Sequence, residues 1–260
     1  MLDIIIACDR RDVDLAFWLS NAPLLFQSTP IQSLILSQSN TVYRLKRNFI
    51  NKVGFSIDEH QVHPPLLGHD KPSSKVGKAA LLLTGFRFST EPFLFFLDSD
   101  IRLPFSLLAS FISKALTTPL SAFYLGAVYE ISGFSPSRIF KGLMPSLQNR
   151  NYGVGHIEII RWQSLGNRPG FGNIFVPRQC YLAAGKHDPG YIHYGWEDHD
   201  LIISLLLNNI TVSPLGFAFH RTHGDDSRLL QTASRSNDVS NSFEYFCKKY
   251  GSLLRSSAEI

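Results

Sequence analysis

The stretch Phe93-Leu94-Phe95-Phe96-Leu97, followed directly by Asp98-Ser99-Asp100, decides the fold. Five consecutive apolar residues predict a strand that is buried on both faces, as in a parallel or mixed sheet. Ligands of open α/β sheets bind beyond the carboxyl ends of such strands. Because alternate residues of an extended segment point the same way, Asp98 and Asp100 are expected to approach one site.

Two interpretations of this D-x-D motif remain open at the level of the motif itself. Paired carboxylates supply the hard oxygen donors that Mg²⁺ and Mn²⁺ prefer. Alternatively, the segment is a plain turn in which Asp98 or Asp100 caps the next segment of the chain. The motif alone favours neither interpretation.

Strands and helices alternate on both sides of the motif. An apolar run at residues 4–7 predicts a buried first strand, and the wide apolar face of 14–22 predicts a helix that Pro23 ends. Residues 51–72 are interpreted as strand fragments and loops, and 132–172 as long connections. Further helices are expected at 73–86, 104–115, 198–208 and 243–246, and further strands at 33–36, 122–130, 173–176 and 210–219. The alternation indicates an α/β protein, with a parallel or mixed sheet and helices on both faces.

Length and composition predict one domain that binds a small ligand. The 260 residues, 44% apolar and 18% charged, suit a single α/β domain with an ample core. A net charge of +4 fits an anionic ligand such as a nucleoside diphosphate, or simply a basic surface. Nucleic acid is not expected as a partner, because Arg44-Leu45-Lys46-Arg47 is only a short run, interpreted as a solvated helix face.

Cysteine usage and hydropathy predict the compartment. Cys8, Cys180 and Cys247 are odd in number and far apart, which indicates neither a disulfide framework nor a zinc site, and Cys8 is expected to be buried. The apolar runs are too short for a transmembrane span, and the first residues do not resemble a signal peptide. We therefore expect a cytoplasmic protein, with peripheral membrane contact left open.

Two further clusters carry ionisable groups. In Gly195-Trp196-Glu197-Asp198-His199-Asp200-Leu201, carboxylates precede an apolar helix, where they serve either as ordinary caps or as a general base. In His220-Arg221-Thr222-His223-Gly224-Asp225-Asp226, two histidines three residues apart follow a strand, and this spacing favours metal ligands. Together with the D-x-D motif, the three clusters can converge at one end of a sheet.

The chain at this point resembles glycosyltransferases of the GT-A fold, a Rossmann-like mixed sheet with helices on both faces. It looks like the family 2 type, and its C-terminal part is similar to β-1,4-galactosyltransferases and polypeptide N-acetylgalactosaminyltransferases. The resemblance covers roughly residues 1–227. It rests on 75–80 leading to Phe96-Leu97-Asp98-Ser99-Asp100, on 172–178, on 184–188, and on 195–201.

The resemblance implies a metal-dependent inverting transferase. Such an enzyme moves a hexose or N-acetylhexosamine from a UDP-sugar to a hydroxyl of a glycan, a lipid-linked acceptor or a peptide. Asp198 would be the general base, and Glu197 would hydrogen-bond a sugar. Mn²⁺ or Mg²⁺ would be held by the metal ligands Asp98, Asp100, His220 and His223, with Asp98 touching either the metal or the ribose. The nucleotide sugar would meet Asp9, Arg11, Lys78, Asp98 and Trp196.

The resemblance also implies a division of the single domain, residues 1–260. Residues 1–130 would form the nucleotide-binding half, 131–227 the acceptor and catalytic half, and 228–260 a C-terminal extension. The chain departs from relatives at Ser37-Gln38-Ser39-Asn40, where many carry an Asp that binds uracil, and at Gly185, where many have two glycines. Two other functions remain open: a metal-dependent nucleotidyltransferase, and a non-catalytic nucleotide-sugar-binding module.

Overall fold

The computed structural model describes residues 1–8, 12–28, 31–38, 41–47, 55–61, 76–131, 168–221, 232 and 234–256. Within these ranges the strands are β1 (Leu2–Ala7), β2 (Ile31–Ser37), β3 (Thr41–Arg47), β4 (Phe55–Gln61), β5 (Phe93–Asp98), β6 (Ile101–Arg102), β7 (Ser121–Ile131), β8 (Arg168–Pro177), β9 (Thr211–Pro214) and β10 (Phe217–Arg221). The helices are α1 (Asp12–Ser28), α2 (Lys78–Arg87), α3 (Phe105–Thr117), α5 (Arg178–Ala183), α6 (Glu197–Leu207) and α7 (Arg235–Ser256).

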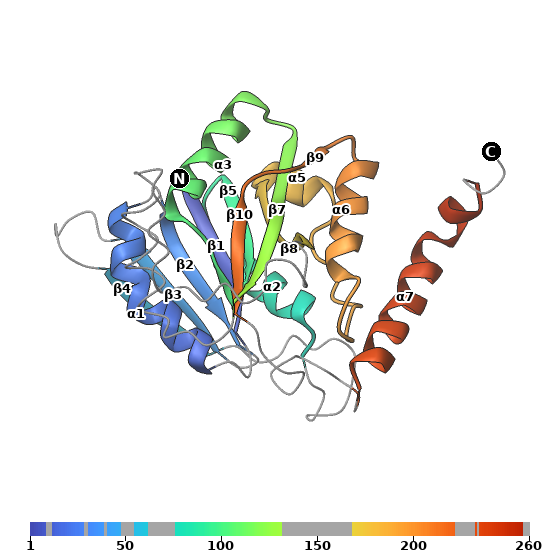
Figure 1. Ribbon diagram of the computed structural model, residues 1–260, viewed down its shortest axis with the longest axis horizontal. Coiled ribbons are helices and arrows are strands. Elements are labelled where there is room, and N and C mark those ends of the chain that lie inside the picture. The colour runs from blue at the N-terminus through green and yellow to red at the C-terminus, as the bar shows by residue number, and fades with distance from the viewer. Residues whose placement is uncertain are drawn as a thin grey trace.

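The described strands form one mixed sheet in the order β4-β3-β2-β1-β5-β8-β7-β10-β6, with β9 paired to β7 (Figure 1). Its centre is parallel, because β1 pairs in parallel with both β2 and β5. Strand β8 runs antiparallel between β5 and β7. Ala7, at the end of β1, is in register with Asp98, at the end of β5. The D-x-D motif therefore begins at the carboxyl edge of the parallel centre, as predicted.

Apolar residues on both faces of the sheet are buried, which produces three layers. Along β1, Ile4 and Ile6 belong to a cluster that includes Trp18 of α1 and Phe111 of α3. Ile5, between them, belongs to a second cluster with residues of α2, α5 and α6. Successive side chains of a strand point to opposite faces, so the run of apolar residues fills both cores. The prediction of a sheet with helices on both faces is confirmed, and so is the burial of Cys8.

Helix α7 is the outermost element and lies beside α6 (Figure 1). Phe246 and Tyr250 of α7 form a small buried cluster with Ala79 of α2 and Tyr191. The hydroxyl of Tyr250 also lies 3.0 Å from Ser204 Oγ of α6. The C-terminal extension thus packs as a helix, as expected around 243–246, but over a much longer range.

The structure corrects three expectations. Pro23 does not end the first helix, which continues to Ser28 because Leu25 and Phe26 are buried in the core. Residues 44–47 are not a helix face but part of β3, which pairs antiparallel with β2 and β4. The expected strand at 210–219 is two strands, interrupted near Gly216, whose φ of +70° lies in the left-handed region.

Candidate functional site

The ammonium group of Lys78 gathers three carboxylates that are far apart in the sequence. Lys78 Nζ lies 2.7 Å from Asp98 Oδ1, 3.1 Å from Asp198 Oδ1 and 3.7 Å from Glu197 Oε1. Lys78 begins α2, Asp98 ends β5, and Glu197 and Asp198 begin α6. The first and second predicted clusters therefore meet, and we call these four residues the Lys78 cluster.

Burial and charge compete at the Lys78 cluster. Burial alone would lower the pKa of Lys78, but the carboxylates of Asp198, Asp98 and Glu197 raise this pKa well above its ordinary value. Burial, together with the charge of Asp198, raises the pKa of Glu197 to about 7. Burial also raises the pKa of Asp198, although Lys78 opposes the shift. The lysine stays charged, and the two carboxyl groups of α6 are more basic than usual, as a general base requires.

The neighbouring carboxyl groups of Glu197 and Asp198 differ in their exposure to solvent. The side chain of Asp198 is 23% exposed and that of Asp98 is 29% exposed, whereas Glu197 is only 4% exposed. Asp198 is the carboxylate of the helix start that can meet a ligand directly.

An irregularity in β8 forms the wall of this cluster. On β7, Tyr124 pairs with Ile174 while the next residue, Leu125, pairs with Gly170, so residues 171–173 of β8 bulge between two paired positions. In the bulge, Asn173 accepts a hydrogen bond from the backbone N–H of Asp98 at 2.8 Å and donates one to Asp98 Oδ2 at 3.1 Å. Bulges of this kind re-aim side chains beside functional sites.

Gly172, the middle residue of the bulge, lies against the side chains of Lys78, Asp98 and Asp198. A Cβ atom at this position would lie 2.6 Å from Asp198 Oδ2, 2.7 Å from Lys78 Nζ and 2.9 Å from Asp98 Oδ2. These separations are too short for a methyl group. The backbone of Gly172 therefore packs directly on the charged groups, and only glycine fits there without a shift.

The second aspartate of the motif contacts another part of the chain. Asp98, Ser99 and Asp100 do not continue as a strand, because Ser99 and Asp100 form a turn after β5. Asp100 Oδ2 lies 3.2 Å from His220 Nε2 at the end of β10, and both residues are buried. His220 and Asp100, both expected as metal ligands, are thus in contact, and their role as ligands stays a prediction. The expected extended geometry of the motif is wrong, and a turn is found instead.

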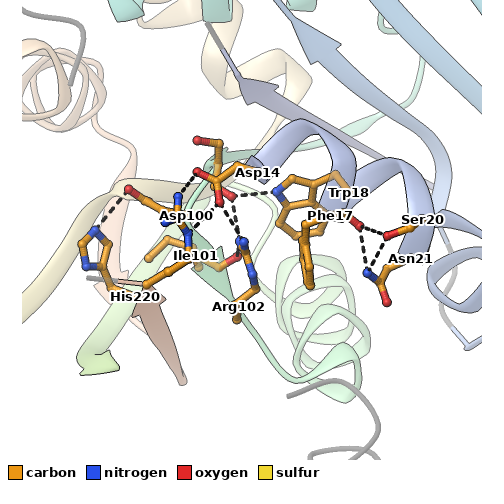
Figure 2. A network of polar contacts seen from close by, with 11 residues as sticks. Asp14, Phe17, Trp18, Ser20, Asn21, Asp100, Ile101, Arg102 and His220 are labelled. Carbon is orange, nitrogen blue, oxygen red and sulfur yellow. Dashed lines mark hydrogen bonds and ion pairs between the residues drawn. The ribbon is translucent and has the colours of Figure 1, made fainter. Parts of the chain in front are cut away.

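A buried ion-pair network holds this turn (Figure 2). The fully buried Asp14 of α1 binds Arg102 through Oδ1 at 2.8 Å and Arg221 through Oδ2 at 2.8 Å. The carbonyl oxygen of Ser99 accepts hydrogen bonds from Trp18 Nε1 at 2.8 Å and from Arg102 Nη1 at 2.7 Å. The turn is thus fixed by α1 and β6 from one side and by β10 from the other.

The predicted site residues therefore fall into two neighbouring groups. Lys78, Asp98, Glu197 and Asp198 form the first, and Asp100 with His220 forms the second. The Trp196 ring packs against Phe243 and Phe246 of α7, with centroids 4.6 Å and 5.0 Å away. Its predicted contact with a nucleotide sugar stays a prediction. Asp9, Arg11 and His223 lie outside the described residues.

Sequence reasoning missed several residues of the site. Asn173 was expected to begin a strand and Gly172 to end a connection, and neither was given a role in the site, because no sequence pattern indicates a bulge. Asp14 was placed in a helix but given no role. His187 is buried with its Nδ1 2.9 Å from the hydroxyl of Tyr181, and burial, with the nearby charge of Lys78, lowers the pKa of His187 to about 3. The imidazole is therefore neutral beside the Lys78 cluster.

Asp100 and His220 are the pair of described site residues whose donor atoms suit a metal cation. A carboxylate oxygen and an imidazole nitrogen, as in Asp100 and His220, are ligands that Mn²⁺ accepts. Among the described residues no group of three or more His, Cys, Asp or Glu side chains could hold a metal ion. Asp100 and His220 could supply two of the ligands of such an ion. No helix within the described ranges is long and apolar enough to cross a membrane.

Comparisons with known proteins give a likeness in structure only. No protein-family model and no curated protein matches the chain. Crystal structures of glucosyl-3-phosphoglycerate synthase from Mycobacterium tuberculosis match it, one with Mn²⁺, UDP and phosphoglyceric acid and another with Mn²⁺, UDP-glucose and phosphoglyceric acid. The first is 15% identical, covers 95% of this chain and 78% of that chain, and has a TM-score of 0.45. The second is 15% identical, covers 95% and 80%, and has a TM-score of 0.44. A likeness at this level does not establish a shared activity.

Proposed function

We propose that this chain is a metal-dependent inverting glycosyltransferase of the GT-A type, which moves a hexose or N-acetylhexosamine from a UDP-sugar to an acceptor hydroxyl. The observation that carries the proposal is the meeting of Asp98, from the end of β5, with Asp198, from the start of α6, on the ammonium of Lys78. A carboxylate with a raised pKa thus stands next to the strand end where α/β sheets bind nucleotides.

Asp198 would act as the general base. It is the more exposed of the two carboxyl groups at the start of α6, and its raised pKa suits it to accept the proton of an acceptor hydroxyl. Lys78 would hold Asp198 in place and keep part of its charge neutralised. Direct attack by the deprotonated hydroxyl on the anomeric carbon would then invert that centre.

Asp98 and Asp100 would have different tasks. Both oxygens of Asp98 already have protein partners, Lys78 at 2.7 Å and Asn173 at 3.1 Å, which favours a contact of Asp98 with the ribose over direct metal binding. Asp100 and His220 would hold Mn²⁺ or Mg²⁺, with His223 as the expected further ligand. When bound, the cation supplies a Lewis acid that offsets the charge of the departing nucleoside diphosphate. Asp9 and Arg11, which come after β1, would contact the nucleotide.

A screen of UDP-sugars with and without Mn²⁺ tests this function. We expect thermal stabilisation by the true donor, and slow release of UDP that requires Mn²⁺ and is lost in Asp100→Ala. Mn²⁺ binding measured by calorimetry without nucleotide should weaken in both Asp100→Ala and His220→Ala. Asp58→Ala, which removes a half-exposed carboxylate of β4 from its pair with Lys46, serves as the control and should change neither readout.

Two results would replace the proposal. Release of pyrophosphate from a nucleoside triphosphate would indicate a nucleotidyltransferase. Binding of UDP without turnover across many acceptors would indicate a binding module.

A further inference from the structure

The bulge of β8 exposes an aromatic side chain beside the Lys78 cluster. Phe171 directly precedes Gly172, whose backbone contacts Asp198 and Lys78. The Phe171 ring makes edge contacts with Tyr124 at 4.9 Å and with His199 at 5.2 Å between centroids. His199 is the residue directly after Asp198 on α6. The group therefore includes the residue that follows the candidate general base on α6 and the residue that precedes Gly172 on β8.

These rings are not used by the core. Phe171 and Tyr124 are half-buried and His199 is exposed, and within the described ranges Phe171 and Tyr124 belong to none of the hydrophobic core clusters. Tyr124, Phe171 and His199 thus form a row of rings, and the row continues to Trp196, whose ring centroid lies 5.0 Å from that of His199. The pairing of β8 is interrupted where Phe171 lies, and the phenyl ring there is partly exposed. This arrangement suggests a ligand that packs on the ring.

The charged groups beside this row of rings restrict the charge of such a ligand. Asp98 and Asp198 outnumber the single ammonium of Lys78 even when Glu197 is protonated, so an anionic ligand that brings no cation would be repelled. Asp198, 23% exposed, is the carboxylate of this group that a ligand can reach. A neutral ligand with hydroxyl groups would donate a hydrogen bond to Asp198 while its apolar face covers the phenyl ring.

We propose that Phe171, flanked by Tyr124 and His199, is the stacking platform for the acceptor, and that the acceptor presents a neutral pyranose ring. The inference rests on the proposed function and adds the class of acceptor to it. A pyranose has a C–H face that packs on an aromatic ring and a hydroxyl edge that reaches carboxylates. The platform would orient one hydroxyl towards Asp198, and phosphorylated acceptors would be excluded by charge.

The test measures binding, so that it does not depend on turnover. The 260-residue chain with UDP and Mn²⁺ is titrated with a panel of methyl pyranosides, with the open-chain alditols of the same sugars, and with phosphoglyceric acid. We expect a pyranoside to bind, its alditol to bind at least about tenfold more weakly, and phosphoglyceric acid to bind more weakly still. Phe171→Leu should weaken pyranoside binding about tenfold, whereas Phe171→Tyr should change it less than about twofold.

Matched controls separate this inference from the donor chemistry. Phe88→Leu removes another half-buried ring, which stacks on His60 beyond the end of α2, and should leave pyranoside binding unchanged. Binding of UDP and of UDP-sugar to Phe171→Leu should equal that of the wild type, which shows that the variant is folded. If UDP-sugar binds and pyranosides do not, or if Phe171→Leu weakens UDP-sugar instead, the platform proposal is wrong and the donor assignment stands. If pyranosides bind with this dependence on Phe171 but no UDP-sugar binds, the platform stands and the transferase proposal falls.

Discussion

At the scale of the residue, Glu197 makes stability depend on pH. Its pKa is 4.5 in the unfolded reference and about 7 in the folded chain, so the folded state holds the proton more tightly. Stability is therefore greatest below pH 4.5 for this group and falls as the pH rises through about 7, by about 3 kcal/mol in all. We expect Glu197→Gln to remove this loss, so that the variant gains on the wild type at pH 8 but not at pH 4.5. Urea unfolding at both pH values measures the difference, and equal curves at pH 8 would contradict it.

Single residues also show how far the sequence could predict the site. The carboxylates of Asp98, Glu197 and Asp198 were identifiable because each stands at the end of an element with a strong hydropathy pattern. Lys78 was expected near the nucleotide, but a sequence cannot show that its ammonium contacts a carboxylate 120 positions away. The partners of Asp98 in β8 were missed for the same reason: they depend on strand register, which local patterns do not fix.

At the scale of the element, the β8 bulge depends on Gly172. We expect Gly172→Ala to push Asp198 and Lys78 apart, because a methyl group would lie within 3 Å of both. Under the proposed function, transfer activity should fall at least about tenfold while UDP binding survives. Gly251→Ala, within helix α7 and with no atom near the added methyl group, is the control and should stabilise the chain by up to about 1 kcal/mol. A Gly172→Ala enzyme with unchanged turnover would show that the contact is unimportant.

Of the two neighbouring lysines of α7, Lys249 is the one expected to stabilise the packing of the helix. Lys249 lies 2.7 Å from Asp188 and 2.8 Å from the buried Asp200, whereas the pair of Lys248 with Glu244 is largely exposed. Lys249→Met should cost about 1–3 kcal/mol and speed proteolysis within α7, because Asp200 loses its charged partner. Lys248→Met should cost less than about 0.5 kcal/mol. Equal protease sensitivity of the two variants would mean that the apolar contacts alone hold the helix.

The elements also show which patterns were informative. Strands buried on both faces and the helices that cover them were predicted from long apolar runs. The pairing of β3 with β4 was not, because charged, half-buried residues of β3 such as Arg44 and Lys46 hide the alternation that marks a strand. The extent of α1 was misjudged because tertiary burial of Leu25 and Phe26 outweighs the helix-breaking tendency of Pro23.

At the scale of the whole molecule, Asp14 joins the first helix to the last strand. It is fully buried, and its two oxygens pair with Arg102 and Arg221 at the two ends of the β6–β10 pairing. Asp14→Asn would leave two guanidinium groups against a neutral amide, so we expect a loss of about 3–5 kcal/mol in the free energy of unfolding. Asp58→Asn, at a half-exposed pair, should cost less than about 1 kcal/mol. Denaturant unfolding of both variants compares them, and similar midpoints would show that the network contributes little.

The pairing of β6 also sets an order of events during synthesis. The strand directly after the D-x-D turn pairs with β10 alone among the described strands, and β10 ends at Arg221. On a ribosome, the turn would emerge more than a hundred residues before the strand and the arginine that hold it. The nascent chain can complete the parallel centre of its sheet early, whereas the Asp100–His220 pair must wait for the last strand. A nascent chain stopped before β10 would carry the first aspartate in place and the second without its histidine.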